Sequence, residues 1–69
     1  MTTKADPLGV GAHVARVRES KGVTQYALAK ELGMNLWRLE NGQYEPSIAS
    51  LRRIAGALNV EVRDLIPDR

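Results

Sequence analysis

The chain has 69 residues, which is the length of one small domain with little buried surface to stabilise it. Its ten lysines and arginines against eight aspartates and glutamates give a net charge of +2, which permits contact with nucleic acid but does not argue for it. Cysteine is absent, which excludes disulfides and thiolate zinc sites, and without a long apolar run or signal core we expect a cytoplasmic protein with no membrane partner.

A first helix is predicted to begin at Pro7 and to end at Lys21-Gly22. Asp6 can cap it, and Pro7 suits the first helical position because the amide it lacks would have no partner there. Spacings of four and three place three valines on one face, which we expect to join the core: Val10, Val14 and Val17.

Two short helices are predicted next, joined by a tight turn. Thr24 is a favoured cap for the second helix, and Gly33 can end it in the left-handed conformation. Asn35 can cap the third helix, which Asn41-Gly42 ends after a short run. Their inward residues follow helical spacing: Leu28, Ala29, Leu32, Leu36 and Leu39.

A fourth helix is predicted after Ser47, which can cap it. Gly56 inside this helix costs about 1 kcal/mol relative to alanine, so we expect a close backbone contact there. A last helical turn is expected from Val62 to Ile66, before Pro67. The pattern predicts an all-α chain of five short helices, the fourth with an inward stripe of Leu51, Ile54, Ala55 and Leu58.

Three segments together resemble the Cro/cI-type helix-turn-helix family of phage and bacterial repressors: VGAHVARVRESKGVTQYALAKELG, ENGQYEPSIASLRRIAGALNV and VRDLI. The likeness covers about residues 10–66. It implies a compact five-helix, lambda-repressor-like domain over residues 1–69, with its core at about 7–66 and its helix-turn-helix at about 24–42. It further implies binding to double-stranded DNA, commonly as a homodimer, with no cofactor.

The third helix is shorter than this resemblance implies. The family usually places about nine residues between the glycine ending the second helix and the glutamate ending the third, whereas Gly33 and Glu40 enclose six. Keeping Leu36 and Leu39 as core positions puts the deficit after Asn35, in the turn that usually touches base edges. We therefore expect reduced or altered sequence reading. Alternatively, the missing residues belong to the protein but not to the written sequence.

Seven residues are candidates for DNA contact by their positions in the family pattern: Gln25, Asn35, Trp37, Arg38, Asn41, Gln43 and Tyr44. Gln25 would bind a phosphate, with an ordinary solvated glutamine as the alternative. Arg38 is the best remaining candidate for reading guanine. We expect Trp37 to pack on the second helix rather than to lie against the DNA backbone. Glu45 opposes phosphate binding by charge repulsion.

The resemblance also pairs Arg18 with Glu40, as a partly buried ion pair that orients the third helix. His13 is expected to be solvated on the exposed side of the first helix, with no neighbouring ligand to share a metal. No serine has a histidine or lysine at a spacing that suggests activation, so the sequence indicates no enzyme and no catalytic residue.

Two functions remain open from the sequence. The favoured one is a sequence-specific transcriptional regulator of the Cro/cI type. The alternative is a protein-interaction module with the repressor fold and lost or reduced DNA reading. For either, an apolar C-terminal segment is the predicted pairing surface: Leu58, Val60, Val62, Leu65 and Ile66.

Overall fold

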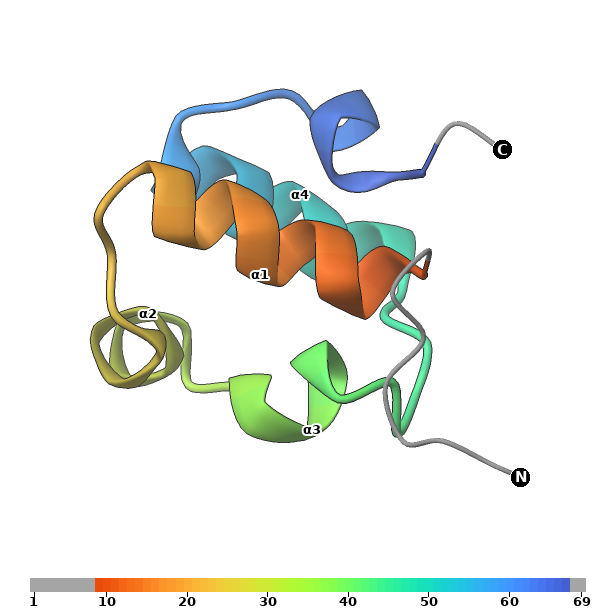
Figure 1. Ribbon diagram of the computed structural model, residues 1–69, viewed down its shortest axis with the longest axis horizontal. Helices are drawn as coiled ribbons and strands as arrows, with labels where there is room; N and C mark the ends of the chain where they lie inside the picture. Colours follow the sequence, from red (N-terminus) through yellow and green to blue (C-terminus); the bar gives the residue numbers. More distant parts are fainter. Residues whose placement is uncertain (1–8, 68–69) are drawn as a thin grey trace.

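The computed structural model describes residues 9–67, which fold into four α-helices and one short 3-10 helix. The elements are α1 (Val10–Ser20), α2 (Gln25–Leu32), α3 (Leu36–Glu40), α4 (Ile48–Leu58) and η1 (Val62–Leu65). These residues contain no strand, so the predicted all-α class is confirmed. The predicted count of five α-helices is not matched, because η1 is a single 3-10 turn that stops before Pro67. In Figure 1, α2 and α3 lie on one side of α1, and η1 lies on the other.

Side-chain caps begin three of the helices at the predicted residues. The cap oxygens of α2, α3 and α4 accept a hydrogen bond from an amide three residues further on, at 3.1, 3.1 and 3.0 Å, and belong to Thr24, Asn35 and Ser47. Each bond satisfies an amide that a helix start leaves without a partner. Gly33 ends α2 at φ +67°, in the left-handed region as predicted.

The start of α1 differs from the prediction. The helix begins at Val10, after an extended Gly9 that offers no side-chain cap. Asp6 and Pro7, on which the earlier start was predicted, lie outside the described residues. The first turn of α1 therefore has neither a side-chain cap from Gly9 nor an acidic residue of its own.

One hydrophobic core draws on all five elements. The predicted inward stripes supply almost all of it, and its buried residues are Val14, Leu28, Leu32, Leu36, Leu39, Leu51, Ile54, Ala55, Leu58 and Leu65. Leu36 and Leu39 are both fully buried, so the short α3 keeps the two core positions assigned to it. Loss of residues before Leu36 shortens the helix without turning its inward face.

The C-terminal residues predicted to pair two copies are mostly inside the domain. Leu65 is 0% exposed and Leu58 is 2% exposed, so neither is available to a partner, and the prediction is wrong for both. Val60 and Val62 pack partly against the same core. Only Ile66 of this set remains well exposed. A small domain uses such apolar residues to complete its own core first.

The predicted backbone contact at Gly56 is also wrong, because a Cβ atom there would meet nothing within 4 Å. Gly11 makes the close approach instead. A Cβ atom on Gly11 would overlap the carbonyl oxygen of Leu39 and lie 3.2 Å from the Cα atom of Glu40. The absence of a side chain at position 11 therefore lets the backbone of α3 rest directly on α1.

Candidate nucleic-acid interface

The turn between α2 and α3 is short and closed by backbone hydrogen bonds. The amides of Gly33 and Met34 both donate to the carbonyl of Ala29, at 2.8 and 3.2 Å, and the amide of Leu36 donates to Met34 at 3.1 Å. The short connection is thus accommodated by a compact turn, and α2 keeps its helical structure to Leu32. The third helix begins at Leu36, where the length deficit predicted it.

Arg53 of α4 strengthens this turn from outside. Its guanidinium donates a hydrogen bond to the carbonyl oxygen of Leu32, the last residue of α2. Helix ends leave such carbonyls without a backbone partner, so the bond both satisfies Leu32 and joins α4 to the turn. Sequence reasoning did not identify Arg53. The available signal was its place beside the apolar stripe of α4, where a long cation can reach a neighbouring helix.

A buried polar cluster holds the other end of α3. Arg18 donates to both carboxylate oxygens of Glu40, from Nε at 2.7 Å and from a terminal nitrogen at 3.1 Å. Its other terminal nitrogen donates to the carbonyl of Val23 at 2.8 Å. The side-chain amide nitrogen of Gln25 donates to a carboxylate oxygen of Glu40 at 2.9 Å. The two residues that the sequence paired are therefore in contact, and Gln25 joins them.

Burial makes this cluster a rigid link. The side chains of Arg18 and Glu40 are only 9% and 6% exposed. The hydrogen bonds that Arg18 donates to the carboxylate of Glu40 raise the pKa of Arg18, so the guanidinium stays charged throughout the neutral range. Because the loss of one partner would leave the other charge buried and unpaired, the pair orients α3 more than it adds net stability.

The outward face of α3 consists of two side chains. Leu36 and Leu39 point into the core and Glu40 faces Arg18, which leaves Trp37 and Arg38 exposed. Trp37 is 56% exposed, so part of its surface is covered by the protein and part is open to solvent. Its packing against α2 stays a prediction.

Several other candidate DNA contacts make hydrogen bonds within the protein. Arg38 donates from Nε to the side-chain oxygen of Gln43 at 3.2 Å. Asn41 donates from its side chain to the carbonyl of Trp37 at 2.8 Å. The side chain of Asn35 is the cap of α3. These bonds tie the loop after α3 to the helix itself.

Two exposed residues of α2 flank this surface and were missed by sequence reasoning. Tyr26 is 75% exposed, and the ammonium of Lys30 lies 5.9 Å from the centre of its ring. A cation at this distance is attracted by the face of the ring. The spacing of four residues on one helix was the signal that could have identified the pair.

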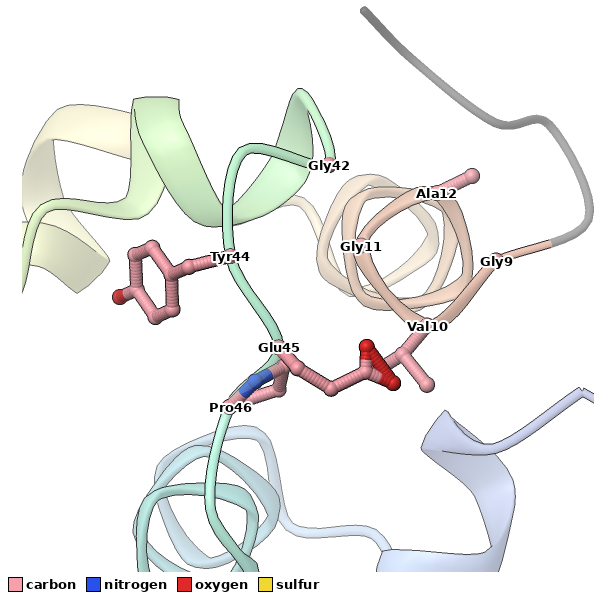
Figure 2. Close-up of a pocket in the computed structure, with 8 residues that line it drawn as sticks. All are labelled: Gly9, Val10, Gly11, Ala12, Gly42, Tyr44, Glu45 and Pro46. Carbon is pink, nitrogen blue, oxygen red and sulfur yellow. The ribbon is translucent and has the colours of Figure 1, made fainter.

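The loop after α3 forms a small hollow with the start of α1, and Figure 2 shows its lining. The side chain of Glu45 extends across the hollow toward Val10, while the ring of Tyr44 points away from it. A carboxylate near the start of a helix is stabilised by the partial positive charge of the free amides there. Glu45 therefore extends toward the first turn of α1, where Gly9 provides no side-chain cap, whereas the sequence suggested mainly that it would repel phosphate.

His13 departs from its prediction. It is half-buried, and its Nδ1 atom is buried without a hydrogen-bond partner, so the expectation of a solvated side chain is wrong. Within residues 9–67, no three or more metal-ligating side chains are grouped to hold an ion. In the same range, no helix combines the length and the apolar composition of a membrane span.

The amino-acid sequence is similar to one protein family and to two phage proteins. The helix-turn-helix family matches residues 14–65. The immunity repressor protein of Bacillus phage phi105 is 30% identical over 60 residues, which are 83% of this chain and 42% of that protein. The ImmF control region 10 kDa protein of the same phage is 39% identical over 59 residues, which are 81% of this chain and 66% of that protein. The chain thus spans less than two thirds of the length of either relative. No solved structure matched it.

Proposed function

The chain belongs to the Cro/cI-type helix-turn-helix family, and from this premise we propose that it is a transcriptional regulator that inserts α3 into the major groove of duplex DNA. The names of the two phage relatives, an immunity repressor and a control-region protein, support a role in regulation. In this arrangement α2 would cross the DNA backbone while α3 approaches the bases.

The observation that carries the proposal is the buried cluster of Arg18, Gln25 and Glu40. It connects the end of α1, the start of α2 and the end of α3 through four hydrogen bonds, if the bond to Val23 is included. Recognition requires side chains held in a fixed geometry, and this cluster holds the helix whose outward residues are Trp37 and Arg38.

Arg38 is the residue that we propose for hydrogen bonding to bases. Its bond to Gln43 uses Nε, which leaves the two terminal nitrogens free to grip guanine O6 and N7. The bond also limits the conformations of the long side chain before DNA arrives, which lowers the entropy cost of binding. Since α3 has five residues, few other side chains reach the bases, and we expect modest discrimination between sequences.

Phosphate contacts would come from the surface around α3. The free amides at the start of α2 favour an anion, and Gln25 lies there with its side chain bound to Glu40. The loop from Asn41 to Tyr44 is the second proposed contact. Contacts of this kind position a protein on DNA and make its affinity fall with salt.

We also propose that two copies bind together. One α3 offers only two outward side chains, and a dimer doubles the contacts on a two-fold site. Ile66 is exposed and directly follows η1 in the chain, and η1 lies on the far side of α1 from α2 and α3 (Figure 1). We propose Ile66 as a contact with the second copy. Sedimentation of the wild type and of Ile66→Asp tests this. A wild type that stays monomeric at high micromolar concentration contradicts the dimer.

The decisive experiment is a titration with labelled duplexes of several defined sequences, each at several salt concentrations. The wild type should bind, and the logarithm of its affinity should fall linearly with the logarithm of salt. Arg38→Ala should weaken binding, and Arg63→Ala is the matched control, because it removes an exposed arginine from η1 on the opposite side of α1. Absence of binding at low salt would refute the proposed function.

A second candidate function is a protein-interaction module. The aromatic side chains of Tyr26 and Trp37 are exposed, and Gln25 donates its side-chain amide to Glu40 within the protein. An aromatic surface of this kind is also found where proteins meet. Loss of DNA binding in the titration, with a stable fold, would favour this alternative.

A further inference from the structure

We propose that Trp37 reads the C5-methyl group of thymine in the major groove. The inference rests on the proposed function and names a chemical group that α3 recognises in addition to the guanine contact of Arg38. It assigns sequence preference to an apolar contact rather than only to hydrogen bonds.

The position of Trp37 is the first step. In helix-turn-helix proteins, the N-terminal residues of the recognition helix approach the base edges. Because α3 begins at Leu36, Trp37 is its second residue. Leu36 is buried, so Trp37 is the first residue of the helix with an exposed side chain. Trp37 therefore occupies the part of the helix that we propose to lie nearest the bases, and its side chain is exposed there.

The carbonyl oxygen of Trp37 accepts two hydrogen bonds from Asn41, one from the side chain at 2.8 Å and one from the backbone amide at 3.1 Å, so the backbone at this position is well ordered within the helix. Trp37 as a whole is 56% exposed. A half-exposed aromatic ring on a fixed backbone is suited to an apolar contact with a partner.

Most of the groups that base edges present in the major groove are hydrogen-bond donors and acceptors. The methyl group of thymine is the largest apolar group among them. An indole has one N–H donor and a large apolar surface. Phosphates and polar base edges can accept a hydrogen bond from the N–H, but they offer no apolar contact to the rest of the ring. Contact with thymine methyl groups removes apolar surface from water on both sides of the interface.

The test begins with a preferred site, selected by the wild type from a pool of random duplexes. Each thymine of that site is then replaced by deoxyuridine, which removes one methyl group and keeps the base pair. Binding is measured by anisotropy of a labelled duplex. We expect at least one replacement to weaken wild-type binding about fourfold, which corresponds to the transfer of one methyl-sized group from water.

Variants of Trp37 test whether its side chain makes the contact with the thymine methyl group. Trp37→Ala should bind the thymine and deoxyuridine duplexes equally, and Trp37→Leu should keep part of the difference. Tyr26→Ala is the matched control, since it removes another exposed aromatic ring while leaving α3 unchanged, and it should preserve the full difference. Far-UV circular dichroism verifies that each variant is folded. Because Trp37 is the single tryptophan, quenching of its fluorescence by DNA gives an independent readout in the wild type.

Three results would overturn the inference. They are equal wild-type affinity for all the thymine and deoxyuridine duplexes, a thymine preference that survives in Trp37→Ala, and selection that yields no preferred site. Salt-dependent binding in any of these cases leaves the proposed function intact. Absence of binding to every duplex refutes both the inference and the proposed function.

Discussion

The two ends of α3 are held in different ways. At the C-terminal end, Glu40 is buried against Arg18 and Gln25, and the backbone rests on Gly11. At the N-terminal end, Asn35 provides an exposed cap, and the turn before it is closed by backbone hydrogen bonds. One end is therefore held by a buried ion pair and by a backbone contact with α1. The other is held by the buried Leu36, an exposed cap, a turn closed by backbone hydrogen bonds, and one bond from Arg53 of α4.

This difference explains how a short recognition helix can keep its place. Buried contacts constrain residue identity and spacing. A shift of Glu40 would remove the hydrogen-bonded partner of the buried Arg18 and leave it only the more distant interaction, at 3.6 Å, with the exposed Glu19. The exposed turn imposes fewer constraints, and residues can be absent there while the inward leucines keep their positions. The end that faces the proposed DNA is thus the end that can change in length without loss of the fold.

The largest expected effect comes from breaking the buried end. Glu40→Ala leaves the guanidinium of Arg18 buried without its carboxylate and should destabilise the domain by about 3–5 kcal/mol. Urea denaturation followed by circular dichroism measures this. The double variant Arg18→Met, Glu40→Leu is the control, because it leaves no unpaired charge, and it should recover much of the loss. A stability of Glu40→Ala equal to that of the wild type would contradict the assigned role.

The backbone contact at the same end gives the next effect. Gly11→Ala forces a methyl group against the carbonyl of Leu39, so α1 and α3 must separate, with an expected loss of about 1–3 kcal/mol. Gly56→Ala is the matched control. It has open space around the added Cβ atom and should be neutral or raise stability by up to about 1 kcal/mol. Equal thermal midpoints for the two variants would show that the α1–α3 contact is looser than described.

Arg53→Ala addresses the other end of α3. The carbonyl of Leu32 would lose its guanidinium donor, and we expect about 1 kcal/mol of destabilisation. Hydrogen exchange of the turn amides should increase more than exchange in α1. Arg52→Ala, on the neighbouring exposed position of α4, is the control and should change neither. Identical exchange in the two variants would argue against a link between α4 and the turn.

The smallest expected effect is that of the cap. Asn35→Ala removes the acceptor for the amide of Arg38 and should lower stability by about 1 kcal/mol or less, because the site is exposed. It should also lower DNA affinity by a larger factor than Ser47→Ala, which removes an equivalent cap from α4. Titration of both variants at the same salt concentration measures this. Equal affinities would mean that the start of α3 does not position the reading residues.

The sequence by itself determined the elements whose signals are local. The caps at Thr24, Asn35 and Ser47, the left-handed Gly33 and the start of α3 all depend on residues adjacent in the chain. The apolar stripes likewise follow from the period of the helix, so most of the core could be predicted. The family resemblance added the partner of Arg18, which local rules do not supply.

The tertiary structure decided which faces meet. It placed Leu65 in the core rather than on a pairing surface, gave the close contact to Gly11 rather than to Gly56, and directed Gln25 to Glu40. It half-buried His13. Periodicity tells which side of a helix is apolar, but it does not tell how far away the neighbouring helix lies or which polar group it presents. Those quantities depend on the packing of residues distant in sequence, and they appear only when the helices are assembled.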